Sequence, residues 1–180
     1  MPMRFALQLT RALPVILISL LAIGTMACPD AMGAADVSHP LIGNPSPSFA
    51  LDSVNGKGKV SMAGLAGKVV IVDFWATWCE PCKKSFPKLQ DISARYRAGG
   101  LTVVGVSEDD DKGGIREFAN SFGADFPLLW DSDKAIAGKW EPGSMPATFI
   151  IDRKGLVRFM HHGYHDGEEL EIEKEVKSLL

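Results

Sequence analysis

The chain has 180 residues, of which 46% are hydrophobic and 23% charged, and its formal net charge is −3 at pH 7. This length suits one well-packed domain rather than two, so we expect a single globular domain. The charge lacks the basic excess that would neutralise a phosphate backbone, so nucleic acid is not an expected partner. Three cysteines are too few for a disulfide-stapled scaffold.

The beginning of the chain, residues 1–35, has the pattern of a secretion signal or an N-terminal membrane anchor. Two arginines precede an uncharged apolar segment, residues 15–23. Small residues suit cleavage before Asp36, or before Cys28 in a sequence that loosely resembles a lipoprotein signal, and an uncut segment would be a short membrane anchor. All three alternatives place the domain outside the cytoplasm: periplasmic, secreted or anchored to the inner membrane.

The next segment, residues 36–46, is rich in Ala, Ser, Pro and Gly and has neither a helical nor a strand period, which indicates a tether. The globular domain is expected from residue 47 to residue 180. Its first feature is a turn signal, Asn55-Gly56-Lys57-Gly58, between two short strand-like runs at 49–53 and 59–62. This pattern predicts a small hairpin ahead of the central strand.

The central strand is expected over residues 69–75, a continuous apolar run interrupted only by Asp73, as in a strand covered on both faces. Cys79 and Cys82 follow at the start of a predicted helix, where unpaired amides and the helix dipole favour a thiolate at the first cysteine. Residues three apart on a helix are neighbours, so the two sulfurs can join and separate without refolding of the domain.

The rest of the pattern alternates helices and strands. The helix after the cysteines is amphipathic, carries Pro87 in its interior and stops at Gly99-Gly100. The remaining elements are expected as a strand (101–106), an acidic loop (108–111), a helix around 115–122, a strand (126–131), a short helix (133–140), a hairpin (147–152 and 156–160) and a closing helix (166–179).

Three groups of polar residues have plain interpretations. The acids at 108–111 lack the glycine and glutamate spacing of an EF-hand calcium loop, so they are expected to be a solvated loop. In the closing helix, acids precede lysines, which complements the helix dipole and indicates a solvated face. The histidines at 161, 162 and 165 are expected at the exposed end of the last hairpin.

These features together resemble the thioredoxin superfamily and, within it, the TlpA/ResA-type extracytoplasmic thiol-disulfide oxidoreductases. The resemblance covers residues 45–180 approximately and is carried by Asp73–Cys82, by Gly143–Asp152 and by the extra helix and strand between residues 107 and 131. It implies an α/β fold with a thioredoxin-like mixed central sheet flanked by helices, an N-terminal hairpin and a central helix-strand insertion.

The position of the two cysteines suggests their roles. Cys79, at the turn, is expected to be the nucleophile, and Cys82, one turn into the helix and more enclosed, is expected to resolve the mixed disulfide. Asp73 matches the buried aspartate of thioredoxin and is the candidate proton acceptor; the alternative is a structural carboxylate paired with lysine or backbone. The resemblance implies that Met145-Pro146 is cis and faces the dithiol; the alternative for Pro146 is an edge-strand or turn proline.

Substrate-binding residues are also implied. The backbone of Met145 would pair with an extended substrate chain, Trp78 would shield the dithiol, and Glu80 and Pro81 lie between the cysteines, where Glu80 would tune the thiolate. Ser85 departs from the family pattern, because ResA-like members commonly have a glutamate three residues after the second cysteine. The role of that carboxylate is therefore not transferred to this chain.

The resemblance favours a reductase of protein disulfides that uses the Cys79/Cys82 dithiol. Apocytochrome c before haem attachment is a candidate substrate, and a membrane electron donor would supply the electrons. No cofactor is expected. The direction of electron flow stays open at this point, since dithiols of this fold span potentials from about −270 to about −120 mV.

Two other functions are weighed. A peroxiredoxin-like thiol peroxidase would have Thr three residues and Pro seven residues before its reactive cysteine, where this chain has Ala76 and Val72. A copper or other metal carrier of related fold could add His161, His162 and His165 to the cysteine pair. Such carriers usually space their cysteines by three residues, and this chain has no second C-x-x-C.

Overall fold

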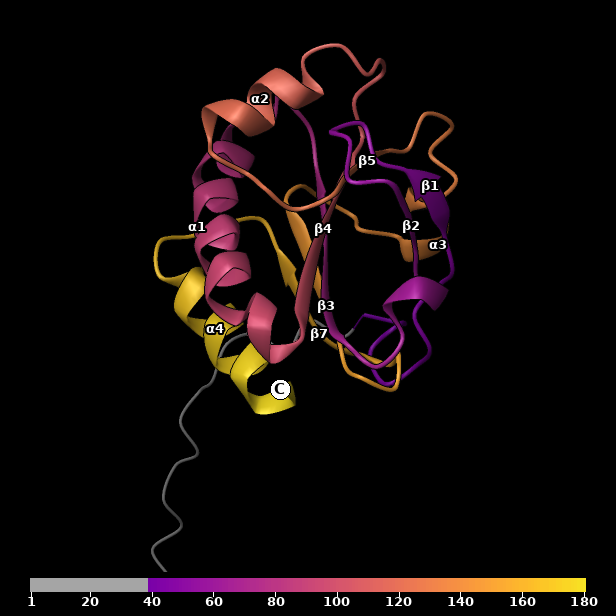
Figure 1. Ribbon diagram of the computed structural model, residues 1–180, viewed down its shortest axis with the longest axis vertical. Helices are drawn as coiled ribbons and strands as arrows, with labels where there is room; N and C mark the ends of the chain where they lie inside the picture. The colour runs from indigo at the N-terminus through magenta and orange to yellow at the C-terminus, as the bar shows by residue number, and fades with distance from the viewer. Residues whose placement is uncertain (1–38) are drawn as a thin grey trace, which may run out of the picture. The chain divides into compact units, whose positions relative to one another are not determined.

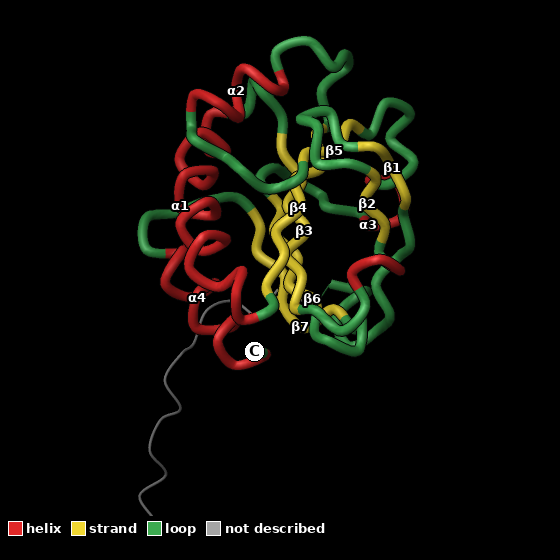
Figure 2. Tube along the Cα trace, in the orientation of Figure 1, coloured by secondary structure: helices red, strands yellow, loops and turns green. Residues whose placement is uncertain are grey.

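The computed structural model describes residues 39–180. The predicted signal or anchor at residues 1–35, and the first part of the predicted tether, lie outside the described residues. Helices cover one face of a central sheet, and a small hairpin with a short helix covers the other (Figures 1 and 2). Within residues 39–180, none of the helices combines the length and apolar character needed to cross a membrane.

The central sheet has five strands in the order β5-β4-β3-β6-β7. Along the chain these strands are β3 Val69–Trp75, β4 Leu101–Ser107, β5 Leu128–Trp130, β6 Ala147–Ile151 and β7 Val157–His162. β3 is parallel to β4, and β4 to β5, whereas β6 is antiparallel to both β3 and β7. The predicted mixed sheet is therefore confirmed, with the strand that leads to the cysteines at its centre.

The predicted hairpin and helices are also present. The hairpin pairs β1 Ala50–Asp52 with β2 Lys59–Ser61. The helices are α1 Glu80–Tyr96, α2 Ile115–Ser121, α3 Ala137–Trp140 and α4 Glu168–Leu179, with 3₁₀ turns at Ala63–Leu65 and Arg97–Gly99. The central insertion comprises α2 and β5.

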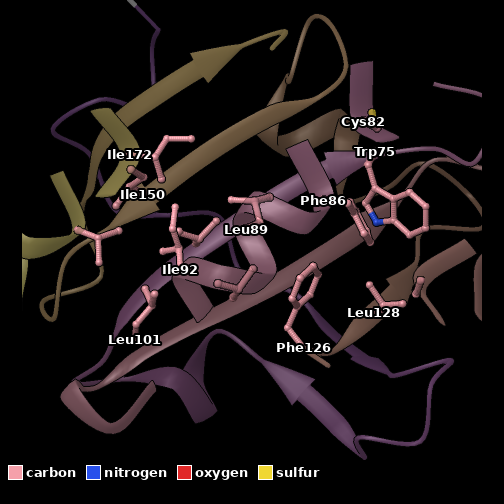
Figure 3. Packing of buried hydrophobic residues seen from close by; sticks show 14 of the residues in the cluster. Trp75, Cys82, Phe86, Leu89, Ile92, Leu101, Phe126, Leu128, Ile150 and Ile172 are labelled. Carbon is pink, nitrogen blue, oxygen red and sulfur yellow. The ribbon is translucent and has the colours of Figure 1, made fainter. Parts of the chain in front are cut away.

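Strand β3 separates two hydrophobic clusters because successive side chains point to opposite faces. Ile71 and Trp75 pack toward α1 and α4, where Figure 3 shows Trp75 beside Phe86. Val72 and Phe74 pack on the opposite side, in the cluster that includes residues of the hairpin and of α3. Burial of each such side chain contributes roughly 1.5–3 kcal/mol, so both faces hold β3 in place.

The described part of the predicted tether, residues 39–46, differs from the prediction. The Gly43 amide donates to the Val157 carbonyl (2.8 Å), the Val157 amide donates to Asn44 (3.0 Å), and the Ser46 amide donates to Gly155 (2.9 Å). These bonds fix the segment against the turn before β7, an edge strand whose backbone groups would otherwise lack partners. Side-chain patterning misses such a segment because backbone groups make the contacts.

Two predictions of solvated charge are wrong in part. In the acidic loop at residues 108–111, Asp109 is only 5% exposed. In the closing helix Glu168 is only 3% exposed, and it faces a mostly buried His161 of the last hairpin. In each case a carboxylate turns inward to hydrogen-bonding partners that lie on another element.

Gly105 of β4 leaves room for the side chains of Trp75 from β3 and Leu128 from β5. A Cβ atom added there would lie 2.9 Å from both Trp75 Nε1 and Leu128 Cδ2. We predict that Gly105→Ala lowers the free energy of unfolding by about 1–3 kcal/mol through overpacking. Urea denaturation measures this. Gly138→Ala in α3 is the control, because nothing lies within 4 Å of its added Cβ; equal losses in both variants would contradict the packing role of Gly105.

Candidate functional site

The two cysteines lie where β3 passes into α1. Cys79 is the N-cap residue of α1, and its Sγ accepts a hydrogen bond from the Cys82 amide at 3.3 Å. The two sulfurs form a disulfide, with an S–S distance of 2.03 Å and a Cα–Cα distance of 5.3 Å. Pro81 lies in the first helical turn, where its missing N–H has no intrahelical partner to lose. The helix N-terminus therefore directs an amide at Cys79 Sγ.

The two sulfur-bearing residues differ in accessibility. Cys79 retains 4% of its surface, whereas Cys82 retains none and packs with Phe86 in the cluster under α1 (Figure 3). Of the two residues, only Cys79 keeps any accessible surface. The order in which the two cysteines react stays a prediction.

Asp109 holds the turn that precedes Cys79, a contact that the sequence interpretation missed. Its carboxylate accepts from the Thr77 amide (3.1 Å), the Thr77 hydroxyl (2.7 Å) and the Ser107 hydroxyl (2.7 Å). Lys134 donates to the backbone carbonyls of Glu108 and Asp109 at 2.7 and 3.0 Å. The sequence did contain a clue to this contact. Parallel neighbouring strands end at the same edge of a sheet, so the loop after β4 and the turn after β3 are expected to lie close together.

Asp73 is fully buried between Ile71 and Trp75 on the face of β3 that α1 covers. Its Oδ1 accepts a hydrogen bond from the Thr148 hydroxyl at 2.7 Å, rather than from a lysine, and Oδ2 has no partner among the described residues. Burial raises the pKa of Asp73 to about 7; the Thr148 hydrogen bond opposes this rise and the charge of Glu168 adds to it. Near neutral pH the carboxyl group can therefore both accept and release a proton.

The Met145-Pro146 peptide bond is cis, as the resemblance implies. Pro146 is buried, and Met145 packs against the hydrophobic cluster that contains Cys79 and Cys82. The Gly163 amide donates to the Pro146 carbonyl at 2.8 Å and ties this segment to the end of β7. Because Ala147 is paired with Phe74, the segment before β6 lies at the edge of the sheet where β3 ends and the chain continues to Cys79.

The other residues around the cysteines differ in exposure. Trp78, which is expected to shield the dithiol, is 67% exposed. The side chain of Glu80 points outward, where it accepts from Lys83 at 2.6 Å. Ser85 is buried, and its hydroxyl donates to the Cys82 carbonyl at 3.2 Å. Trp78 therefore stands out from the surface next to the reachable cysteine.

The three histidines weighed as metal ligands have separate surroundings. His161 lies between Glu168 and Glu175, His162 Nδ1 lies 3.4 Å from the Ser144 hydroxyl, and His165 is mostly exposed. In residues 39–180, no group of three His, Cys, Asp or Glu side chains is arranged to hold a metal ion. The expectation of an exposed histidine cluster is wrong for His161, because two carboxylates of α4 enclose it.

Comparisons with known proteins agree with this geometry. Residues 42–160 match the AhpC/TSA family. The thiol-disulfide oxidoreductase ResA of Bacillus subtilis is 35% identical over 115 residues, and the chain spans 64% of that relative's length. ResA of Bacillus anthracis is 32% identical over 137 residues, which cover 76% of this chain and 79% of the relative.

Solved structures lead to the same group. A candidate thiol:disulfide interchange protein DsbE from Chlorobium tepidum aligns with a TM-score of 0.72 and 33% identity, over 77% of this chain and 96% of that one. A candidate protein disulfide isomerase from Bacteroides thetaiotaomicron aligns with a TM-score of 0.71 and 27% identity, over 77% and 89% of the two chains. The chain therefore belongs to the AhpC/TSA family, as a thioredoxin-like thiol-disulfide oxidoreductase of the ResA type.

Proposed function

We propose that this oxidoreductase works as a reductase of protein disulfides outside the cytoplasm, with Cys79 as nucleophile, Cys82 as resolving cysteine and Asp73 as proton acceptor. The observation that carries the proposal is the difference in exposure: Cys79 retains some accessible surface and Cys82 none. A dithiol built in this way reacts with a partner through one sulfur and releases it through the other.

The first step forms a mixed disulfide. The Cys79 thiolate attacks one sulfur of the partner's disulfide, the bond between the partner's sulfurs breaks, and the released thiolate takes a proton from water. The Cys82 amide, 3.3 Å from Cys79 Sγ, stabilises the negative sulfur before attack. The hydrogen bonds of Thr77 to Asp109 keep the turn in place while this bond forms.

The second step releases the partner. The Cys82 thiol passes its proton to Asp73, and the resulting thiolate attacks Cys79 Sγ. The Cys79–Cys82 disulfide forms as the mixed disulfide breaks, and the second partner sulfur leaves as a thiolate that water protonates. Two electrons have then passed from the dithiol to the partner. A dithiol donor in the membrane is proposed to return two electrons and regenerate the reduced form.

The proposed substrate contacts surround Cys79. Trp78, with two thirds of its surface exposed, can lie against a partner chain, and Glu80 and Pro81 occupy the turn beside it. The backbone of Met145, next to the cis-proline, would pair with an extended substrate segment. The leader sequence supports an extracytoplasmic site with a cleaved signal or a membrane tether. Apocytochrome c is the candidate substrate that the family resemblance suggests.

Cys82→Ser tests the order of the two cysteines. Without the second sulfur, the mixed disulfide on Cys79 cannot be resolved, so we expect disulfide-linked partners to accumulate and to separate on reduction. Non-reducing electrophoresis and mass spectrometry of the captured species measure this. Cys79→Ser is the matched control and should capture nothing. An empty Cys82→Ser sample would argue against the reductase.

Asp73→Asn tests the buried carboxyl group. Its pKa is raised in the folded protein from 3.8 to about 7, so the folded state holds the proton more tightly than the unfolded chain. As pH rises from about 4 to about 7, the carboxyl group ionises in the unfolded chain but stays protonated in the folded protein. The free energy of unfolding of the oxidised wild type therefore falls progressively over this range. The variant lacks this loss, and at about pH 8 it should be more stable than wild type by up to about 4 kcal/mol.

Urea denaturation of the oxidised proteins at several pH values measures this difference. The two proteins should converge toward pH 4, where the wild-type carboxyl group is protonated in both states. Asp91→Asn, an exposed position on α1, is the control and should follow wild type at every pH. A stability gap that does not change with pH would show that Asp73 lacks the raised proton affinity.

A further inference from the structure

A row of polar side chains crosses the sheet on the face covered by α1 and α4. Asp73 of β3 is paired with Thr148 of β6, and Thr148 is paired with His161 of β7. Directly paired residues on neighbouring strands project their side chains to the same face, and the Thr148 hydroxyl donates to Asp73 at 2.7 Å. Asp73, Thr148 and His161 are therefore successive neighbours on one face of the sheet.

Two carboxylates of α4 hold that histidine. His161 Nε2 lies 2.7 Å from Glu175 Oε2, and His161 Nδ1 lies 3.5 Å from Glu168 Oε1. Burial lowers the pKa of His161, but its hydrogen bonds to Glu168 and Glu175 outweigh this and raise it to about 9. At neutral pH His161 is therefore an imidazolium, held between the side chains of Glu168 and Glu175.

Glu168 is the buried member of this cluster. It is 3% exposed, whereas the side chain of Glu175 is 23% exposed. Its position at the start of α4 favours a negative charge, and the exposed His165 approaches its Oε1 at 3.7 Å. A buried carboxylate is costly to desolvate, and an apolar side chain would cover the sheet without that cost. What the carboxylate adds is a fixed negative charge inside the domain.

This charge acts on Asp73. Thr148 of β6 donates a hydrogen bond to Asp73, Glu168 of α4 is the charged group that acts on it, and its neighbour on β4 is Gly105, which has no side chain. Cys82, in the first turn of α1, packs in the cluster on the same face of β3. Of the charged groups, Glu168 disfavours the ionised form of Asp73, in addition to the effect of burial. Both carboxyl groups are buried, so the repulsion between them is weakly screened.

We propose that Glu168 is a positioning residue for the resolving step: its buried charge, held by His161, sets how tightly Asp73 keeps the proton taken from Cys82. The proposal rests on the proposed function. Glu168 itself neither gives nor takes this proton, which moves from Cys82 Sγ to the Asp73 carboxyl group. The charge makes Asp73 a stronger base, and it therefore determines the pH range over which the mixed disulfide is resolved.

The test compares Glu168→Gln with Glu175→Gln in the full oxidised chain. Both remove one negative hydrogen-bonding partner of the same histidine from the same helix, but only Glu168 acts on Asp73. NMR titration of the Asp73 side-chain carboxyl carbon gives the midpoint directly. We expect a lower midpoint in Glu168→Gln and a wild-type midpoint in Glu175→Gln. The acid limb of the pH profile for resolution should move by the same amount.

Further variants separate charge from structure. Glu168→Asp keeps the charge and should restore most of the wild-type midpoint, and Glu168→Ala replaces Glu168→Gln should the latter not fold. An unshifted midpoint in the uncharged variants, or equal shifts at positions 168 and 175, would overturn the proposal.

The titration requires no turnover, so this failure is distinguishable from failure of the reductase. An unshifted Glu168→Gln midpoint in a protein that still resolves mixed disulfides overturns the role of Glu168 alone. Wild-type resolution by Asp73→Asn overturns the role of Asp73 on which it depends.

Discussion

The attachment of α1 to the end of β3 is the constraint on which the chemistry depends. β3 is covered on both faces, so its end has a fixed position, and Asp109 ties the following turn to β4 through Thr77. The helix therefore begins at Cys79 with an amide directed at its sulfur, and Cys82 lies one turn deeper in the core. The small accessible surface of Cys79 and the complete burial of Cys82 are consequences of this single junction.

Burial has a second consequence at the same place. A carboxyl group held away from water keeps its proton to higher pH, so Asp73 can exchange a proton near neutrality. The hydrogen bond from Thr148 limits this effect and the charge of Glu168 increases it. The pairing of β3, β6 and β7 thus decides which polar side chains become neighbours of Asp73. Catalytic carboxyl groups in buried sites are commonly adjusted by this balance of desolvation and neighbouring charge.

The sequence predicted the parts of the molecule whose hydrophobic periods are strong: β3, α1, β4 and the β6–β7 hairpin. It also placed the cysteines at a helix start. It did not predict that Asp109 and Glu168 are buried, because a run of acids has the same composition whether one member points inward or none does. Which carboxylate turns inward depends on partners that lie on other elements, Thr77 for Asp109 and His161 for Glu168. Residues 39–46 were missed because their contacts use the backbone.

Alkylation of the reduced native protein measures the difference in accessibility between the two sulfurs. The chain is treated with a limiting amount of iodoacetamide, and peptide mapping follows each cysteine, with Cys28 distinguished by its own peptide. We expect Cys79 to be modified first and Cys82 to react readily only after unfolding. Modification of Cys82 before Cys79, or of both at one rate, would contradict it.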